Sequence, residues 1–346
     1  MGLFKDRLRH SDGTTQVPVW FMRQAGRYHS HYQNIKKDSD FMTMCKDPIM
    51  ACEITMGPIR DFNFDAAILF SDLLFPLEQL GLGLTYNPGP ILEFKLESVS
   101  DLRNCKIISP SNQYYQFQKE ATALLKVALP KEKSLLGFVG SPFTLYTYAV
   151  EGSHNGNLTS SKKGFYDGRF QGFCEILIPE LVTEMSLQAQ GGADAICLFD
   201  TAVGELMLCD FKEFILPMLK KVTSEFKKLH PQTKVVYYSK LTHINYLDAI
   251  EDKNIDVLGV DWRVSMKDAL KTLGSDYMIQ GNIDPSYLHY HWPLLEQKLS
   301  QYWTELADSG APLNKWICGL GHGVLQQTPE ANVKKAVEYI HTNFKY

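Results

Sequence analysis

The feature that most constrains the fold is a regular alternation, along 346 residues, of short apolar runs with segments whose apolar residues have helical spacing. The predicted strands lie at 17–22, 66–70, 135–139, 195–199, 234–238, 257–260, 277–280 and 316–318. The predicted helices lie at 43–60, 112–128, 171–190, 211–229, 243–251, 266–273, 293–307 and 330–343. Eight strand–helix repeats without a long linker predict an α/β fold, a single (β/α)8 barrel domain over residues 1–346.

A doubly wound sheet is the alternative to a barrel, and it would need a glycine-rich phosphate loop after an early strand. The chain has no G-x-G-x-x-G there, because Gly81-Leu-Gly83 lacks a third glycine. Two longer segments are rich in turn-forming residues: 81–110 is predicted as a loop or hairpin, and 150–170 as a loop. Loops of this length on a barrel usually shape the mouth of the active site.

Composition excludes several classes of protein. The net charge of −4 argues against a general nucleic-acid binder. No apolar run reaches the roughly 18 residues that span a bilayer, and the first ten residues are too short and too charged for a signal peptide. The 7 cysteines are scattered and contain no C-x-x-C pair, which favours reduced thiols. We therefore expect a cytoplasmic protein without nucleic-acid or membrane partners.

Polar residues follow the predicted strands, and in a parallel barrel all strands end at one rim, where catalytic groups collect. Three segments have an Asp before the strand and another at its exit: 65–72, 194–200 and 256–261. The polar exit residues are Arg23, Asp72, Ser141, Asp200 or Thr201, Lys240, Asp261, Asn282 or Asp284, and His322. This ring predicts an enzyme site or an acidic-ligand site at one rim, and it does not name the reaction.

Two arginines, Arg23 and Arg27, follow the first apolar run four residues apart. If the chain is helical there, both guanidiniums lie on one side and suit the binding of carboxylates, the alternative being surface ion pairs. Residues 1–37 also hold seven Lys and Arg against two Asp. This excess predicts either a solvated arm or an electrostatic funnel for an acidic ligand.

Three further residues are candidates for chemistry. Asp72, after a buried strand, is suited to accept several N–H hydrogen bonds from a ligand, or to cap the next helix. His322 lies between glycines that allow close backbone approach to a ligand, which favours proton handling or carboxylate binding over a structural role. Tyr148 presents a phenol or packs in the core.

A metal site is disfavoured by the sequence. A strand-end zinc site needs a pair such as His-x-Cys, whereas the fifth strand ends in Tyr238-Ser-Lys240. Cys318 is isolated in the sequence, and we expect it to be a small buried apolar residue.

Seven segments resemble the uroporphyrinogen decarboxylase family, in order and over nearly the whole chain. They are PVWFMRQAGRY (18–28), FSDLL (70–74), GSPFTLYTYAVEG (140–152), GADAICLFDT (192–201), GVDW (259–262), QGNIDP (280–285) and GLGHGVL (319–325). The resemblance implies a homodimeric (β/α)8 barrel without cofactor or metal. It implies a porphyrinogen substrate with eight carboxylates, whose four acetate side chains lose CO2 and become methyls.

The resemblance also implies roles for individual residues. Asp72 and Arg23 match the catalytic positions, with Asp72 at the pyrrole N–H groups of the macrocycle. The positions that match substrate-binding residues are Arg27, Lys36, Tyr148, Thr201 and His322. Thr201 stands where serine is more usual, Lys36 where arginine is common, and Gly319 where asparagine is usual; residues 29–33 also depart from the family pattern.

Two alternatives remain open at this point. One is a zinc-dependent methyltransferase of the same superfamily, acting on a corrinoid or a thiol. The other is a relative that binds a tetrapyrrole without turning it over.

Overall fold

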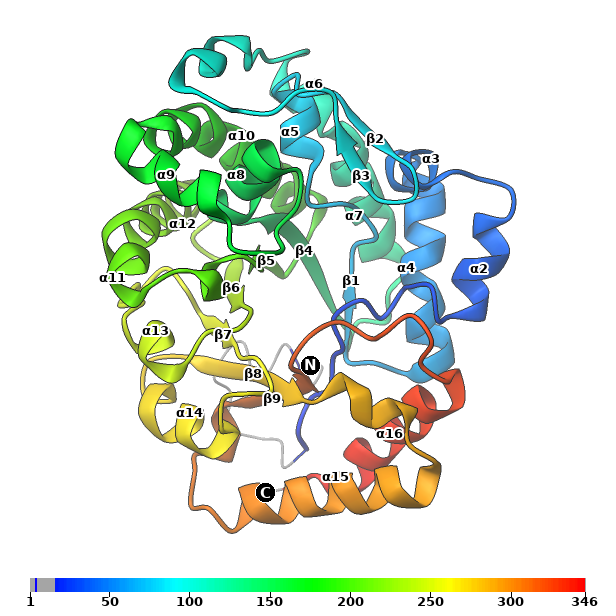
Figure 1. The fold of residues 1–346 in the computed structure, drawn as a ribbon. Coiled ribbons are helices and arrows are strands. Elements are labelled where there is room, and N and C mark those ends of the chain that lie inside the picture. Colours follow the sequence, from blue (N-terminus) through cyan, green and yellow to red (C-terminus); the bar gives the residue numbers. More distant parts are fainter. Residues whose placement is uncertain (1–3, 5–15, 346) are drawn as a thin grey trace.

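A computed structural model describes Phe4 and residues 16–345, and its centre is one curled sheet of seven parallel strands. In sheet order these are β1 (Ala66–Ile68), β4 (Ser134–Gly140), β5 (Ala195–Asp200), β6 (Lys234–Ser239), β7 (Val257–Gly259), β8 (Met278–Ile283) and β9 (Trp316–Leu320). Figure 1 shows the strands curving round the middle of the molecule with helices outside. Seven of the eight predicted strands are therefore confirmed.

Helices connect the strands and cover the outside of the sheet. They are α2 (Ser30–Lys36), α3 (Phe41–Lys46), α4 (Pro48–Phe62), α5 (Phe75–Gln79), α6 (Ser111–Tyr114), α7 (Gln116–Ala128), α8 (Pro142–Glu151), α9 (Thr159–Asp167), α10 (Arg169–Gly191), α11 (Leu208–Asp210), α12 (Leu216–Leu229), α13 (Ile244–Asp248), α14 (Met266–Leu273), α15 (Trp292–Ala307) and α16 (Glu330–Asn343). Short turns of tighter or wider helix are η1 (Val99–Asn104), η2 (Val203–Glu205), η3 (Phe211–Ile215), η4 (Pro285–His289) and η5 (Leu313–Lys315).

Every predicted helix is present, but the one predicted at 43–60 is split between α3 and α4. The carboxylate of Asp47 accepts the N–H groups of Ile49 (2.9 Å) and Met50 (3.0 Å), and Pro48 begins the new helix. An aspartate cap followed by proline is a strong helix start, so the chain begins again here. The prediction of a loop at 150–170 is wrong in part, because α9 lies within that segment.

The predicted first strand, 17–22, is not a strand of the sheet. Val19 makes a single parallel bridge with Cys318 of β9. The N–H of Trp20 donates to the Cys318 carbonyl (3.0 Å), and the N–H of Asp65 donates to the Val19 carbonyl (3.0 Å). This segment therefore lies between the two edge strands, β9 and β1. Pro18 has no N–H to donate, which limits the pairing.

The chain turns directly after this segment. Arg23 has a positive φ of 60°, and residues 22–28 form turns and bends. The helical arrangement considered for Arg23 and Arg27 is therefore wrong. The hairpin considered within 81–110 is confirmed by the antiparallel pair β2 (Leu84–Tyr86) and β3 (Pro90–Leu92), seen near the top of Figure 1.

Alternate residues of the strands pack together on the inside of the curled sheet. On β4 these are Leu136 and Phe138, and on β5 they are Ala195, Cys197 and Phe199. The strands are buried on both faces, as in other parallel sheets covered by helices. Phe138 and Phe199, near the carboxyl ends of β4 and β5, form the end of this inner layer. Cys318 is fully buried, as predicted.

Candidate active site

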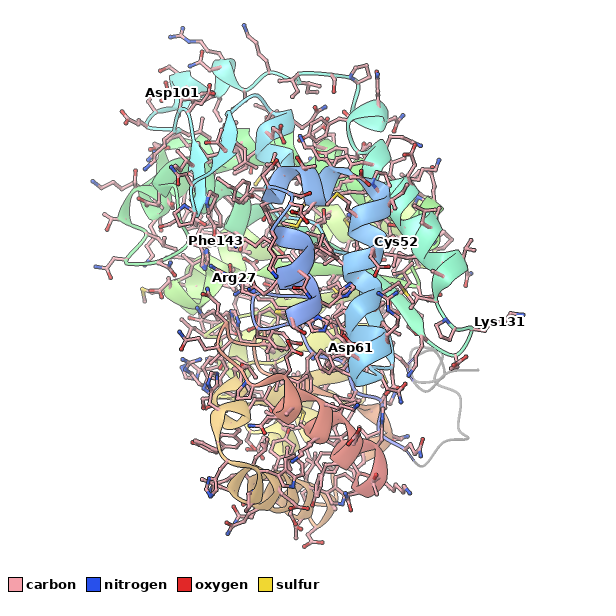
Figure 2. All side chains as sticks on the ribbon, turned by 90° about the vertical axis from the view of Figure 1, so that its right-hand side faces the viewer. Arg27, Cys52, Asp61, Asp101, Lys131 and Phe143 are labelled. Carbon is pink, nitrogen blue, oxygen red and sulfur yellow. The ribbon has the colours of Figure 1, made fainter. Side chains whose placement is uncertain are left out.

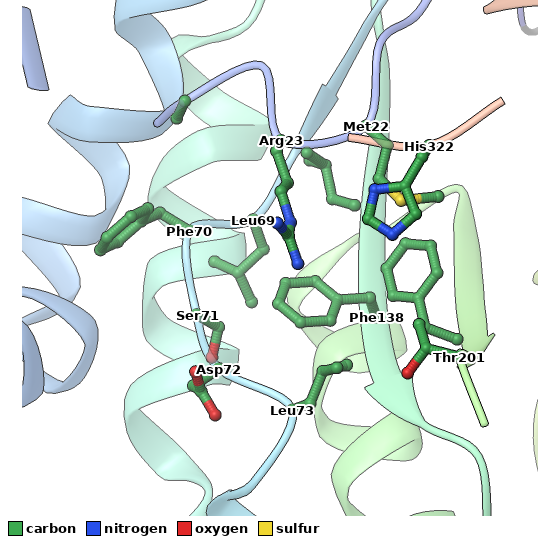
Figure 3. Close-up of a pocket in the computed structure, with 13 residues that line it drawn as sticks. Met22, Arg23, Leu69, Phe70, Ser71, Asp72, Leu73, Phe138, Thr201 and His322 are labelled. Atoms are coloured by element: carbon green, nitrogen blue, oxygen red, sulfur yellow. The ribbon is translucent and has the colours of Figure 1, made fainter. Parts of the chain in front are cut away.

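A cavity of about 210 Å³ lies at the carboxyl ends of β1, β4 and β5. Its lining residues are Met22, Arg23, Ala25, Ile68, Leu69, Phe70, Ser71, Asp72, Leu73, Phe138, Phe199, Thr201 and His322. Figure 3 shows Arg23 and His322 entering from one side, with Asp72 on the other and Phe138 between them. Four of the predicted site residues, Arg23, Asp72, Thr201 and His322, are thus brought to one cavity.

Arg23 reaches the cavity because a glycine stands beside it. A Cβ atom at Gly323 would lie 2.4 Å from the Arg23 Cδ, so only glycine leaves room for the arginine there. The side chain of Arg23 is open to the cavity but enclosed by protein, and this loss of water lowers its pKa. Arg23 is nevertheless exposed on its cavity side, where its guanidinium can bind an anionic ligand directly.

Asp72 lies in the segment that follows β1, and its Oδ1 accepts the N–H of Leu74 at 2.8 Å. Since α5 begins only at Phe75 with no side-chain cap, Asp72 is not the helix cap that the sequence left open. Burial raises the pKa of Asp72, while the Tyr86 phenol, the Leu74 N–H and Arg23 lower it. The Tyr86 hydroxyl is near this carboxylate, although within residues 16–345 it makes no hydrogen bond of normal geometry.

Thr201 and His322 bring two further polar groups to the cavity. The Thr201 Oγ1 is buried and has no hydrogen-bond partner among the described residues. The Nδ1 of His322 accepts the N–H of Gly323 at 2.7 Å. Burial, helped by Arg23 and Lys240, lowers the pKa of His322 to about 3. His322 is therefore a neutral ring whose Nε2–H serves as a hydrogen-bond donor.

The glycines around His322 have a different use from the predicted one. Gly323 makes room for Arg23, and a Cβ at Gly321 would lie 2.3 Å from the backbone nitrogen of Trp262. These close approaches are to the protein itself. They fix the loop that carries His322.

Tyr148, on α8, is half-buried beside the cavity rather than in its wall. Its hydroxyl lies 2.6 Å from Nδ1 of His154. Burial raises the pKa of Tyr148 to about 12, and burial lowers the pKa of His154 to about 4. Both side chains are neutral near pH 7, so the pair is a hydrogen bond rather than an ion pair. Sequence reasoning missed His154, which lies between α8 and α9.

Arg27 and Lys36, also predicted to bind substrate, lie outside the cavity. Both are exposed, and Figure 2 shows Arg27 on the face formed by α2 and α4. With the Gln326 amide turned so that its oxygen faces Arg27, the Arg27 Nη1 donates to that oxygen at 3.2 Å. Of the basic residues in segment 1–37, Lys5, Arg7 and Arg9 lie outside the described residues, and Arg23 alone among the others lines the cavity.

Two other strand-exit residues, Asp200 and Asp261, have structural roles. Asp200 is buried and accepts hydrogen bonds from Thr144 Oγ1 (2.8 Å) and the Tyr237 hydroxyl (3.0 Å). Burial raises the pKa of Asp200 to about 7. Asp261 is buried against Arg263, 2.8 Å away. The choice between Asp200 and Thr201 is thus resolved: Thr201 faces the cavity.

Sequence reasoning also missed three lining residues, Ser71, Phe138 and Phe199. The two rings lie 5.6 Å apart, centroid to centroid, and give the cavity an aromatic wall. Such faces pack against flat or gently bent rings. The two phenylalanines could have been predicted, because they are inward-facing residues near the carboxyl ends of β4 and β5. Ser71 could have been predicted from its place directly before Asp72.

The described part of the chain holds no group of three or more His, Cys, Asp or Glu side chains placed to bind a metal ion. In the same residues, no helix combines the length and the apolar character that crossing a membrane requires.

The fold and the cavity define a class of protein: a parallel α/β protein with a cationic and an anionic group facing one partly apolar cavity at the strand ends. A family model described as uroporphyrinogen decarboxylase (URO-D) matches residues 7–343. The chain belongs to the uroporphyrinogen decarboxylase family. Uroporphyrinogen decarboxylase from Carboxydothermus hydrogenoformans is 33% identical over 335 residues, covering 95% of this chain and 93% of that protein. The protein of the same name from Helicobacter pylori strain G27 is 36% identical over 332 residues, covering 95% of both chains.

Solved structures agree on the fold. A methyltransferase from Methanosarcina mazei superposes with a TM-score of 0.74 over 97% of this chain and 96% of its own, at 17% identity. A putative vitamin-B12-independent methionine synthase from Listeria monocytogenes gives a TM-score of 0.56 over 94% and 96% of the two chains, at 13% identity. At such identities the likeness concerns the fold alone.

Proposed function

We propose that the protein decarboxylates the four acetate side chains of uroporphyrinogen III to methyl groups, giving coproporphyrinogen III and CO2 without a cofactor. Family membership supports this activity. The observation that carries the assignment of the site is the shared cavity of Arg23 and Asp72. It offers a cation for a carboxylate and a carboxylate for pyrrole N–H groups.

The reaction uses the substrate as its own electron sink. A proton adds to the pyrrole carbon beside the acetate and gives a cation. The bond to the carboxylate then breaks, CO2 leaves, and its electron pair neutralises the cation and leaves an exocyclic methylene. A second proton adds to this methylene to complete the methyl group, and the first proton leaves the ring carbon, which restores the pyrrole. Asp72 stabilises the cation, since a fixed charge aimed at developing charge is an effective catalytic device. Arg23 holds the reacting acetate, and the proton donor is not assigned.

The size of the cavity supports the treatment of one acetate at a time. Ligand pockets usually enclose roughly 300–1,000 Å³. Since a cavity of about 210 Å³ is smaller than that range, we infer that it takes one pyrrole with its acetate rather than the whole macrocycle. The other carboxylates then lie at the mouth. We assign them to Tyr148, to the outer Arg27 and Lys36, and to the donors Thr201 and His322 at the wall.

We further propose that the chain forms one domain, an eight-stranded barrel in which residues 17–22 take the eighth place. The hydrogen bonds of Trp20 to Cys318 and of Asp65 to Val19, at 3.0 Å each, support this closure. We also propose a cytoplasmic homodimer. All seven cysteines are unpaired, which supports a reducing compartment. The dimer follows from the resemblance of the sequence.

The test is anaerobic incubation with uroporphyrinogen III, followed by separation of the products by carboxylate number. We expect successive loss of four carboxylates. Binding without any loss would contradict the proposal and would favour the tetrapyrrole-binding alternative. Stoichiometric zinc together with methyl transfer would favour the methyltransferase.

A further inference from the structure

A buried set of polar side chains lies behind the cavity wall at Ser71. Gln118 of α7 is 1% exposed, and Glu184 and Gln188 of α10 are both 0% exposed. None of them touches the cavity. Uncharged amides are rarely placed so deep unless every hydrogen bond is made, so their arrangement is informative.

The orientation of Gln188 is fixed by the backbone of β4. The N–H of Phe138 donates to Gln188 Oε1 at 2.7 Å, and Gln188 Nε2 donates to the Phe138 carbonyl at 3.0 Å. Exchanging the amide oxygen and nitrogen of Gln188 would place its NH2 group against the Phe138 N–H and its oxygen against the Phe138 carbonyl. The approach also requires Gly137, because a Cβ there would lie 2.1 Å from Gln188 Oε1.

Gln188 in turn fixes Gln118. The Gln188 Nε2 donates to Gln118 Oε1 at 3.0 Å, so the amide nitrogen of Gln118 must face the other way. That nitrogen lies 3.1 Å from Ser71 Oγ and 2.7 Å from Glu184 Oε1. An amide nitrogen only donates hydrogen bonds. The Ser71 oxygen is therefore an acceptor toward Gln118.

The remaining hydrogen of Ser71 is left for the cavity. A serine hydroxyl carries one hydrogen, and the bond from Gln118 is the only one that Ser71 Oγ makes within residues 16–345. Ser71 lines the cavity next to Asp72 (Figure 3). The backbone of β4 thus orients, through two glutamines, a hydroxyl donor at the cavity wall.

We propose that Ser71 donates a hydrogen bond to a carboxylate oxygen of the bound substrate, and that Gln118 is the positioning residue that directs it. This inference rests on the proposed function, since it takes the ligand to be a polycarboxylate. A neutral donor beside Asp72 lets a substrate carboxylate approach that acid without a second cation.

Glu184 completes the arrangement by holding the second hydrogen of the Gln118 amide. Its Oε1 accepts the second hydrogen of Gln118, and its Oε2 has no partner within the described residues. Burial, and then the charge of Asp72, raise the pKa of Glu184 well above its ordinary value. Both hydrogens of the Gln118 amide are thereby used, so the amide cannot turn away from Ser71.

A double-mutant cycle tests the proposal. Ser71→Ala should raise KM for uroporphyrinogen roughly 10- to 100-fold, the usual range for a hydrogen bond to a charged group, with a smaller change in kcat. Gln118→Met should raise KM about 2- to 10-fold, because the hydroxyl remains but is no longer held in one rotamer. In the Ser71→Ala background, Gln118→Met should change KM no further.

Two results would overturn the proposal: an unchanged KM in Ser71→Ala, or an equal effect of Gln118→Met in both backgrounds. Ser134→Ala is the matched control. Ser134 is a fully buried serine at the amino end of β4, whereas the cavity lies at the carboxyl end, so this substitution should leave KM unchanged. If Gln118→Met does not fold, Ser71→Ala still decides whether the donor exists.

The proposed function and this inference can fail separately. An unmodified protein that does not decarboxylate uroporphyrinogen would refute the function. In that case the same double-mutant cycle is measured by binding: the Kd of each variant for uroporphyrin, the stable octacarboxylate porphyrin, is determined by fluorescence quenching. Weaker binding in Ser71→Ala, with no further loss on adding Gln118→Met, supports the assignment of Ser71, and unchanged binding refutes it.

Discussion

Three aspartates at the amino end of the parallel sheet and Asp72 at its carboxyl end lie in opposite surroundings. At the amino end, Asp65, Asp194 and Asp256 each accept the backbone N–H of a neighbouring segment. These N–H groups belong to Val19 (2.8 Å), Leu135 (2.8 Å) and Val235 (2.9 Å). Asp194 thereby ties β5 to β4, Asp256 ties β7 to β6, and Asp65 ties β1 to the segment that contains Val19.

A lysine accompanies each of these three acids. Lys133 lies 3.5 Å from Asp65, Lys126 lies 2.8 Å from Asp194, and Lys227 and Lys234 lie 2.9 and 2.7 Å from Asp256. The charge at the amino end is therefore compensated within the protein. Such acids stabilise the fold and leave nothing for a ligand.

Asp72, at the carboxyl end, bonds only within its own segment and has no lysine beside it among the described residues. Its carboxylate accepts one backbone N–H, from Leu74, and no basic side chain of the described residues lies within ion-pair distance. The comparison indicates that an aspartate beside a strand is a candidate catalytic residue only where no basic side chain or N–H group of a neighbouring segment already neutralises its charge. It also yields experiments in which one end should affect activity and the other stability.

Apart from changes at Asp72 itself, the largest expected effect is on activity at the carboxyl end. Arg23→Ala should lower kcat/KM roughly 100- to 1,000-fold, because it removes a fixed charge from the cavity. Arg27→Ala, outside the cavity, should change kcat/KM by less than about 10-fold, as expected for an exposed ion pair. Both are measured by steady-state decarboxylation. Equal losses in the two variants would contradict the placement of the site.

At the amino end, Asp256→Ala should lower the free energy of unfolding by about 2–4 kcal/mol, because two lysines and the Val235 N–H lose their partner. Denaturant unfolding measures this loss, and kcat of the folded protein should be unchanged. Asp72→Ala should show the reverse pattern. A stable Asp256→Ala protein with little activity would remove the distinction between the two ends.

The buried Asp200 predicts that the stability of the fold depends on pH. Because burial raises its pKa to about 7, the folded state holds a proton that the unfolded state releases near pH 4. Stability from this group is therefore present at low pH and is lost as pH rises from about 4 to 7, by up to about 1.4 kcal/mol per pH unit. Denaturation midpoints of Asp200→Asn should lack this slope. Parallel curves for the two proteins would contradict the buried, protonated state.

The smallest expected effect concerns salt. Association of an octa-anionic porphyrin with a cavity that presents Arg23 should slow severalfold between roughly 0.01 and 0.15 M salt, because screening shortens the reach of the charge. Stopped-flow fluorescence measures the on-rate. An on-rate independent of salt would count against the funnel predicted from the basic residues near the start of the chain.

Much of the fold was predictable from local patterns, because seven strands coincide with apolar runs that are buried on both faces. The exception is segment 17–22, whose apolar residues predict a strand. It contains Pro18 and ends at the left-handed turn at Arg23, and whether such a segment forms a strand depends on the hydrogen bonds it can make with its neighbours. The split between α3 and α4 was available from Asp47 and Pro48. The start of α8 was likewise signalled by Pro142.

The residues of the candidate site that could be predicted are those that contribute a charged or polar group on their own, without depending on a network of other side chains. Asp72, Thr201 and His322 follow strands, Arg23 follows the apolar segment 17–22, and the curl of the sheet brings the four residues together. The relay from Phe138 through Gln188 and Gln118 to Ser71 was not predictable, because it depends on how α7 and α10 dock. The pair of Tyr148 and His154 depends in the same way on the path of the loop between α8 and α9.

The most direct test of the account is the turnover of Asp72→Asn, which keeps the shape of the side chain and removes its charge. We predict decarboxylation of uroporphyrinogen III at least about 1,000-fold slower than in the unaltered protein, with the denaturation midpoint little changed. Turnover within a few fold of the unaltered protein would contradict the claim that the uncompensated acid at the cavity is the catalytic group.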